Sequence, residues 1–342
     1  FGLEVDASLL GASTTLETSS KNKKLSTISG IRYRDNSLFI KSQQTTTNIN
    51  PIAFDFQTYE NYSFSNKFSL GFLGNISHNN YQNQPKTRTT NFGTINDPKS
   101  LSIYYAGREK NTYTTALGAL KATYNVNDKT VLKLIPSIYH TVEQESSDVI
   151  AQYELGDLDT NLGEISNVKR LGTQFNRARN TLDALILNVE HKGKYVSNKR
   201  VIDWGLKYSH EDIRDQLRES EFLDSLGFFV RPPSSEFSNN QPEEPFNAPL
   251  EALQSINASN FVKTNRVSGY VQLSNQLQLG NNEVYYNLGV RSQYWAVSQE
   301  NIAGKGQFIF SPRAQFGIKP NWEKDMLFKF ATGIYHQPPF YR

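Results

Sequence analysis

The chain has 342 residues, of which 37% are hydrophobic, 12% are aromatic and 20% are charged, and its formal net charge is +3. This near balance, without a long basic run, gives no support for nucleic-acid binding. The chain has no cysteine, which excludes a disulfide framework and a thiolate metal site. No run approaches the roughly 20 apolar residues of a membrane-spanning helix, so a helical membrane protein is excluded.

Six hairpins follow one another along the chain, each with two alternating strands and a short polar turn. We expect their strands at 3–17 and 24–40, 53–64 and 68–80, 112–125 and 130–142, 180–192 and 199–211, 263–277 and 284–297, and 307–319 and 326–336. Phe68, Leu70 and Phe72 alternate with Ser69 and Gly71, which predicts one apolar and one polar face. Most of these strands exceed the roughly 9–11 residues that cross a bilayer at a tilt.

The other connections are long and polar, at 81–111, 143–179 and 212–262. Structureless loops of this length are uncommon in compact soluble domains, but outer-membrane barrels carry them on the outside and short turns in the periplasm. We also expect a short helix from Glu211 to Asp224. The pattern predicts an all-β, antiparallel up-and-down transmembrane β-barrel portion of about 12 strands with long extracellular loops.

Prolines and apolar residues within the strands allow two further predictions. Pro136 and Pro312 each interrupt a predicted strand, and because proline lacks a ladder donor we expect a bulge at each. Alternating apolar side chains are expected to face lipid, the first partner that this fold implies. The residues predicted on this face are Phe68, Leu70, Phe72, Leu132, Leu134, Phe308, Phe310, Phe316, Phe328 and Phe330.

Residues for catalysis are not gathered in any recognisable motif, and we expect neither an enzyme nor a cofactor. The five histidines lack the close His/Glu spacing of a zinc enzyme and are interpreted as interface residues. Asp157, Asp159, Asn161 and Glu164 alternate as calcium ligands do, yet the EF-hand pattern fails, and a solvated loop is favoured.

Aromatic side chains in the long loops are the candidates for ligand binding, because exposed rings often mark binding surfaces. The opposing interpretation is that the loops fold over one another and bury them. The candidates are Phe92, Tyr104, Tyr105, Phe222, Phe228 and Phe229.

Several stretches resemble the barrel of TonB-dependent receptors of Bacteroidetes-type bacteria. They are Phe72–Ile76, Asp203–Tyr208 with Glu211–Ile213, Gly289–Arg291 with Tyr294–Trp295, Phe310–Ala314, Lys319–Trp322 and Gly333–Arg342. The resemblance implies a 22-stranded barrel in the cell outer membrane, plugged by an N-terminal domain. It implies uptake of a scarce small solute with energy relayed through TonB. Residues 1–342 are then expected to be an interior portion of the barrel, without the plug and the C-terminal strands.

Two other classes of function stay open. One is a complete smaller outer-membrane barrel that acts as a passive channel, and the other is a secreted β-rich adhesion or glycan-binding protein. For the receptor, the expected partners are outer-membrane lipid, its own plug domain, TonB and the unidentified solute. A surface lipoprotein partner is left open.

Overall fold

The computed structural model describes residues 1–43, 47–224, 252–299 and 302–337. One antiparallel sheet of 14 strands contains nearly all of them, and its strands follow one another in chain order apart from β6, which pairs only with β7. The strands are β1 (Gly2–Ser8), β2 (Gly11–Ser19), β3 (Leu25–Asp35), β4 (Thr47–Ser63), β5 (Phe68–Pro85), β6 (Arg88–Thr94), β7 (Asp97–Asn127), β8 (Thr130–Leu158), β9 (Ile165–Ser197), β10 (Arg200–Asp224), β11 (Ala252–Leu279), β12 (Asn282–Gln299), β13 (Ile302–Lys319) and β14 (Phe328–Gly333). The all-β, up-and-down prediction is confirmed.

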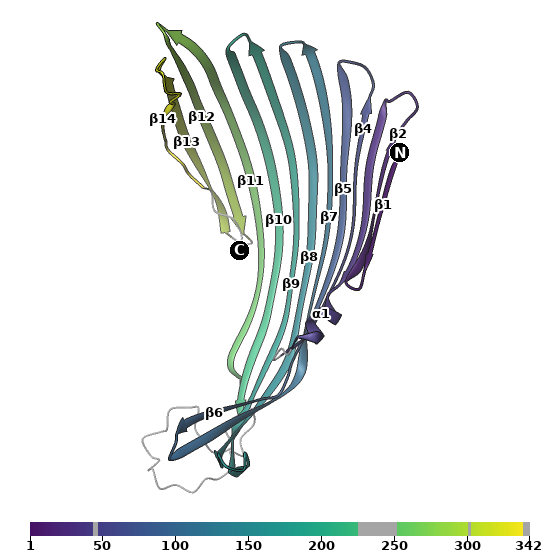
Figure 1. Ribbon diagram of the computed structural model, residues 1–342, viewed down its shortest axis with the longest axis vertical. Helices are drawn as coiled ribbons and strands as arrows, with labels where there is room; N and C mark the ends of the chain where they lie inside the picture. Colours follow the sequence, from purple (N-terminus) through teal and green to yellow (C-terminus); the bar gives the residue numbers. More distant parts are fainter. Residues whose placement is uncertain (44–46, 225–251, 300–301, 338–342) are drawn as a thin grey trace.

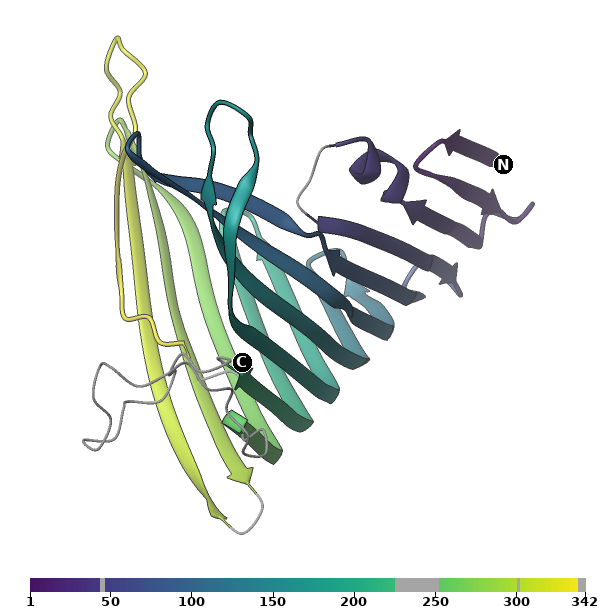
Figure 2. The ribbon, with the colours of Figure 1, turned by 90° about the horizontal axis from the view of Figure 1, so that it is seen from below.

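The sheet is strongly curved and forms a trough with β1 at one edge and β14 at the other (Figure 2). All the short turns of the predicted hairpins lie at one end of the strands (Figure 1). At the opposite end β7 to β11 continue well past their neighbours and bend away (Figure 1). We call this continuation the extension. It consists of β6 and of residues 97–113, 143–182, 213–224 and 252–262.

The register of the ladders assigns every residue of the sheet to one of two faces. Residues that lie opposite each other in neighbouring strands point to the same side, and sequence neighbours point to opposite sides. Phe72 of β5 lies opposite Leu120 of β7, and we call the face to which both side chains point the apolar face. Leu73, which follows Phe72 in the sequence, points to the other side, and we call that side the polar face. All ten residues that we expected to face lipid belong to the apolar face.

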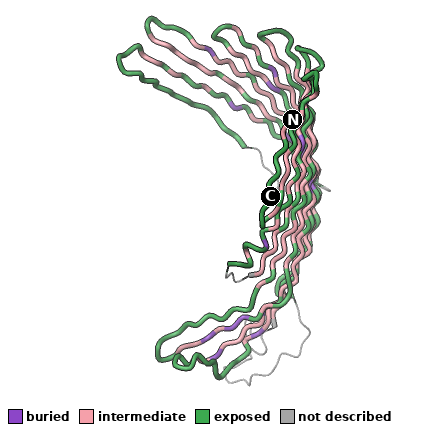
Figure 3. Tube along the Cα trace, turned by 45° about the vertical axis from the view of Figure 1, so that its right-hand side comes forward, coloured by how far each residue is buried: buried purple, intermediate pink, exposed green. Residues whose placement is uncertain are grey.

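The two faces differ in how much of their surface is accessible. On the apolar face, Leu206 and Val271 are 56% and 53% exposed, although both are large aliphatic residues. On the polar face, Trp295 and Ser209 are buried, at 4% and 5%. Side chains converge on the concave side of a curved sheet and diverge on its convex side. These exposed fractions therefore place the polar face on the inside of the curve, and Figure 3 shows how buried and exposed residues are distributed along the trace.

The first predicted strand, 3–17, is two strands joined by a turn at Leu9 and Leu10. The Ser8 hydroxyl accepts a hydrogen bond from the Leu10 N–H at 3.2 Å, a local bond that competes with the ladder. Together with β6, this division raises the count from about 12 strands to the observed 14.

The second predicted strand, 24–40, ends early. Asp35 accepts a hydrogen bond from the Ser37 N–H at 2.9 Å, and a short helix, α1 (Ser37–Ser42), follows. Among the described residues, no helix has the length and apolar character needed to cross a membrane.

The long loops are the largest correction, because most of their described residues are strand. Only 159–164 separate β8 from β9, and 81–111 contain the end of β5, the whole of β6 and the start of β7. The predicted helix from Glu211 to Asp224 is also wrong, since β10 pairs there with β9 and β11 on its two sides. Residues 225–251 lie outside the described residues.

The bulges expected at Pro136 and Pro312 are absent from the described ladders. Pro312 lies opposite Val290 in unbroken register, and its carbonyl accepts a hydrogen bond from Ile334, just past the end of β14. The position where Pro312 lacks a backbone N–H therefore faces the end of β14. Pro136 lies opposite Val189, and the β7–β8 ladder keeps its register on either side of it. Proline is tolerated here by local loss of pairing without an inserted residue.

Gly193 allows a test of packing on the apolar face. The Trp204 indole lies over it, donates a hydrogen bond to His191 at 3.3 Å, and occupies the space of a Gly193 side chain. Gly193→Ala should lower the free energy of unfolding by about 1–3 kcal/mol, because overpacking displaces a well-packed ring. Urea unfolding in detergent micelles, followed by tryptophan fluorescence, measures this change.

The matched control is Gly269→Ala, since an added Cβ at Gly269 would be 3.6 Å or more from its neighbours. Equal destabilisation by both substitutions would contradict the packing argument.

Candidate functional site

The apolar face carries a continuous band of apolar and aromatic side chains from the short-turn end to about the middle of the long strands. On β8 the band runs through Leu132 and Leu134 to Ile138, and on β10 through Trp204 to Tyr208. The next residue on this face of each strand is a histidine. Amphipathic and aromatic side chains are typical at the boundary between an apolar layer and water.

Three histidines mark this boundary. His78 contacts Thr114 at 2.9 Å, His140 contacts Asp183 at 2.8 Å and His210 contacts Asn265 at 2.8 Å. Each ring has a polar partner on the neighbouring strand, and the three lie on different strands of the same face. The interpretation as polar residues at the edge of an apolar band agrees with these positions, and His191 is instead placed within the band beside Trp204.

Cations gather on the polar face in the half of the sheet near the short turns. We call this group the inner basic belt: Lys121, Lys133, Lys192, Lys194, Lys207, Arg291 and Arg313. Lys133 and Lys192 lie directly opposite each other, an arrangement that destabilises a sheet unless an anion is near. Glu190 is 3.0 Å from Lys192, and no described residue forms an ion pair with Lys133.

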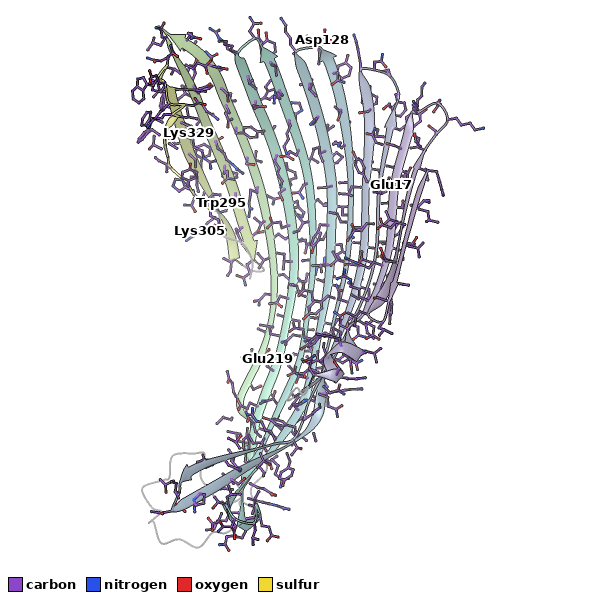
Figure 4. The ribbon with its side chains drawn as sticks, in the orientation of Figure 1. Glu17, Asp128, Glu219, Trp295, Lys305 and Lys329 are labelled. Atoms are coloured by element: carbon purple, nitrogen blue, oxygen red, sulfur yellow. The ribbon has the colours of Figure 1, made fainter. Side chains whose placement is uncertain are left out.

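Carboxylates replace cations on the polar face of the extension. We call this group the inner acidic wall: Glu109, Glu143, Glu145, Asp215, Glu219 and Glu221. Within the described residues, no Lys or Arg occupies a ladder position opposite any of them. Figure 4 labels Glu219 at the bend of the sheet and Asp128 at the short-turn end. The concave surface thus changes from basic to acidic along the strands.

Neutral side chains donate hydrogen bonds to four carboxylates of this wall, those of Glu109, Glu145, Glu219 and Glu221. Asn83 donates to Glu109 at 3.0 Å and Tyr113 to Glu145 at 3.2 Å. Burial raises the pKa of the Glu143 carboxyl, and the neighbouring charge of Glu145 raises it further. Amide and phenol donors orient a carboxylate without neutralising its charge. The wall therefore offers oriented acceptors and negative charge to a solute.

The aromatic candidates do not form one cluster. Tyr104 and Tyr105 are neighbours in β7 and so point to opposite faces. Phe92 of β6 is half exposed and lies opposite Lys99. Phe222 of β10 stacks on Phe175 of β9, with ring centroids 5.9 Å apart. Phe228 and Phe229 lie outside the described residues, and a role in ligand contact stays a prediction for all six.

The acidic candidates near Asp157 make protein contacts. Asp157 pairs with Lys99 at 2.6 Å and accepts from Asn167 at 2.8 Å. Asp159 accepts hydrogen bonds from the backbone of Asn161 and Leu162, which closes the β8–β9 turn. Across the described residues, no group of His, Asp and Glu side chains has the geometry to hold a metal ion. Asn161 and Glu164 lie in the same turn.

The charged groups on both faces were missed by the sequence interpretation, although a signal for them exists. Arg108, Glu109 and Lys110 are consecutive, as are Arg218 and Glu219. Charge alternates here with the period of two that hydrophobicity shows elsewhere. A search for alternation in charge sign would have found both the extension and its two faces.

The fold defines the class of this chain as an all-β sheet of up-and-down strands curved as a barrel wall. No family model matches the sequence, and no curated protein matches it. Among solved structures, the ferric preacinetobactin receptor BauA from Acinetobacter baumannii has a TM-score of 0.49 and 9% identity over 90% of this chain and 44% of that chain. The outer membrane protease OMPT from Escherichia coli has a TM-score of 0.24 and 11% identity, with 95% and 88% of the two chains covered.

The chain thus spans 44% of the length of the BauA chain. Likeness at these TM-scores and identities assigns no family and no activity to this chain.

The Lys99–Asp157 pair generates a prediction for the tip of the extension. Asp157, and then Asp97, raise the pKa of Lys99 to about 12, while Lys99 and then Asn167 lower the pKa of Asp157. Because the pKa of Lys99 is raised, the charged lysine stabilises the folded tip at pH values below 10.5, and this stabilisation is lost as pH rises toward 12. Because the pKa of Asp157 is lowered, the ionised carboxylate stabilises the folded tip at pH values above 3.8, and this stabilisation is lost as pH falls below that value. The tip should therefore resist proteolysis best at pH values between these two limits.

Pepsin nicking within 157–167, normalised to an unstructured substrate, measures this at acid pH. The wild-type chain should become sensitive as pH falls below 3.8, whereas Asp157→Asn should be sensitive above that value as well. Asp97→Asn is the control, because Lys99 keeps its shorter contact with Asp157. Identical pH profiles for wild type and Asp157→Asn would refute the role of this pair.

Proposed function

We propose that the chain forms part of the barrel wall of an outer-membrane receptor that takes up a scarce nutrient with energy relayed through TonB. The observation that carries the proposal is the two-faced sheet. Large apolar side chains are exposed on its convex face, and polar and charged side chains line its concave face, on strands longer than a bilayer requires. Burying the apolar band in lipid removes that surface from water.

Backbone pairing gives this proposal a second requirement. β1 and β14 are the edges of the described sheet, and unpaired backbone groups cannot rest in lipid. In the membrane these edges must pair, either with each other or with further strands. A receptor barrel of the larger type would supply such strands.

The inner basic belt supports the proposal that a plug domain packs inside the barrel. Lys133 lies opposite Lys192 and, unlike Lys192, forms no ion pair with a described residue, so an acidic surface of a plug would supply its counter-charge. The belt also lies near the short turns, the end that would face the periplasm and TonB. A surface lipoprotein would instead meet the tip of the extension.

The inner acidic wall is the proposed capture surface for the solute. Its oriented carboxylates favour a solute with positive charge or exposed hydrogen-bond donors. Binding and passage need no bond chemistry, and we propose a transporter that is not an enzyme. The cell outer membrane of a Gram-negative bacterium is its proposed location.

Neighbouring residues of β5 test the membrane assignment. Phe72 and Leu73 are each 39% exposed but point to opposite faces. Phe72→Arg should destabilise the barrel by about 2–4 kcal/mol if it lies near the bilayer midplane, whereas Leu73→Arg should cost much less because its charge stays on the polar inner face. Urea unfolding in phospholipid vesicles measures the difference. A larger cost for Leu73→Arg would overturn the assignment of the faces.

Cells that express the full-length protein test the transport proposal through the solutes they remove from a defined medium. Glu109→Gln, Glu145→Gln and Glu219→Gln together should reduce removal at low solute concentration by about tenfold or more, since hydrogen bonds to charged groups are the stronger ones. Mass spectrometry of the medium identifies and measures the depleted solutes.

Glu323→Gln, in the exposed β13–β14 connection, is the control for that variant. A second experiment measures the same solute depletion in cells that lack TonB. Depletion that persists without TonB would show a passive channel and contradict energised uptake.

A further inference from the structure

The apolar face becomes strongly basic where the long strands pass from the apolar band into the extension. Seven cations form what we call the outer basic strip: Arg108, Lys110, Arg177, Arg179, Arg214, Arg218 and Lys263. They come from β7 on one side of β8 and from β9, β10 and β11 on the other. All of them share the face of the apolar band, because the ladders continue in register from the band into the extension.

Carboxylates on this face neutralise only part of the strip. Asp148 pairs with Arg179 and lies 3.7 Å from Arg177. Asp212 is 3.3 Å from Arg214 and 3.6 Å from Lys263. No described carboxylate forms an ion pair with Arg108, Lys110 or Arg218, and all three side chains are exposed. The strip therefore keeps a net positive charge on an open surface.

The position of the strip along the strands is defined by the end of the apolar band. On β10 the face passes from Tyr208 through His210 to Arg214, and on β11 from Val267 to Lys263. At about 3.3 Å per residue and a tilt near 45°, Arg214 and Lys263 lie roughly 9–14 Å beyond the last apolar side chains of their strands, and Arg218 lies further out along β10. Flexible Arg and Lys side chains can shorten that distance by reaching toward the band. This is the level of lipid headgroups next to a hydrocarbon layer.

The opposite face shows that this charge belongs to one side of the sheet. Glu109 lies between Arg108 and Lys110, and Glu219 follows Arg218. At the same level the polar face is acidic and this face is basic. A merely soluble surface would mix the two signs, so the segregation points to two different environments for the two faces.

We propose that the outer basic strip binds the phosphate groups of an anionic lipid in the outer leaflet of the membrane. The inference rests on the proposed function, because it requires the apolar band to lie in lipid. Arg177, Arg214 and Arg218 present planar guanidinium groups, which bind phosphate oxygens in a bidentate manner. Continuity with the band means that one lipid can place its acyl chains on the band and its phosphate on the strip.

Binding of a diphosphorylated disaccharide lipid to the full-length protein tests the proposal. The protein is held in nonionic detergent micelles, and retained lipid is measured by mass spectrometry across a titration. The wild-type protein should retain this lipid in preference to its dephosphorylated form. Arg177→Gln, Arg214→Gln and Arg218→Gln together should weaken binding by about 100-fold.

The matched control removes the same charge from the exposed β2–β3 turn at the short-turn end, with Lys21→Gln, Lys23→Gln and Lys24→Gln, and should change retention little. Inorganic phosphate should not compete at concentrations far above that of the lipid. The proposal is overturned if the dephosphorylated lipid binds equally well, if the control loses as much binding as the test variant, or if inorganic phosphate displaces the lipid, which would indicate a site for free anions.

Insertion into vesicles of phosphatidylcholine separates this proposal from the one on which it rests. Insertion without any preference for phosphorylated lipid would overturn the lipid site and leave the barrel assignment standing. Failure to insert into these vesicles would overturn both.

Discussion

The in-register antiparallel ladder is the constraint on which the rest of this structure depends. Because side chains alternate along a strand, pairing of one residue fixes the face of every other residue in that strand. From β7 to β10 the ladders keep one register over most of their length. A slip by one residue would exchange the apolar band with the inner basic belt and place carboxylates where the outer basic strip lies. Register therefore specifies the chemistry of both surfaces.

The sequence predicts the half of the sheet near the short turns well. Phe68, Leu70 and Phe72 alternate with small or polar residues, and the turn at 64–67 that joins β4 to β5 agrees with the predicted hairpin. Hydrophobic alternation is a direct consequence of one apolar and one polar environment, so it reports strands wherever that contrast exists. All six predicted hairpin turns join the strands that they were expected to join.

The extension could not be predicted by the same reasoning, because both of its faces are polar. In Arg108, Glu109 and Lys110 the alternation is one of charge, and a stretch this polar reads as a loop. The aromatic candidates were selected as members of loops, and the ladder places Tyr104 and Tyr105 on opposite faces. The carboxylates of the inner acidic wall were overlooked because they are far apart in sequence and share one face only through the pairing of β7, β8, β9 and β10.

Continuous strands also give the extension a mechanical character that loops would not have. β7, β8 and β9 pass from the short-turn end to the tip of the extension, and β8 has a hydrogen-bonded neighbour on each side over nearly its whole length. A solute that touches Glu109 or Glu145 meets side chains whose backbone is already ordered, so little conformational entropy is lost on contact. The same stiffness makes the extension a lever: a displacement at its tip is carried along the strands to the barrel wall, where a flexible loop would absorb it.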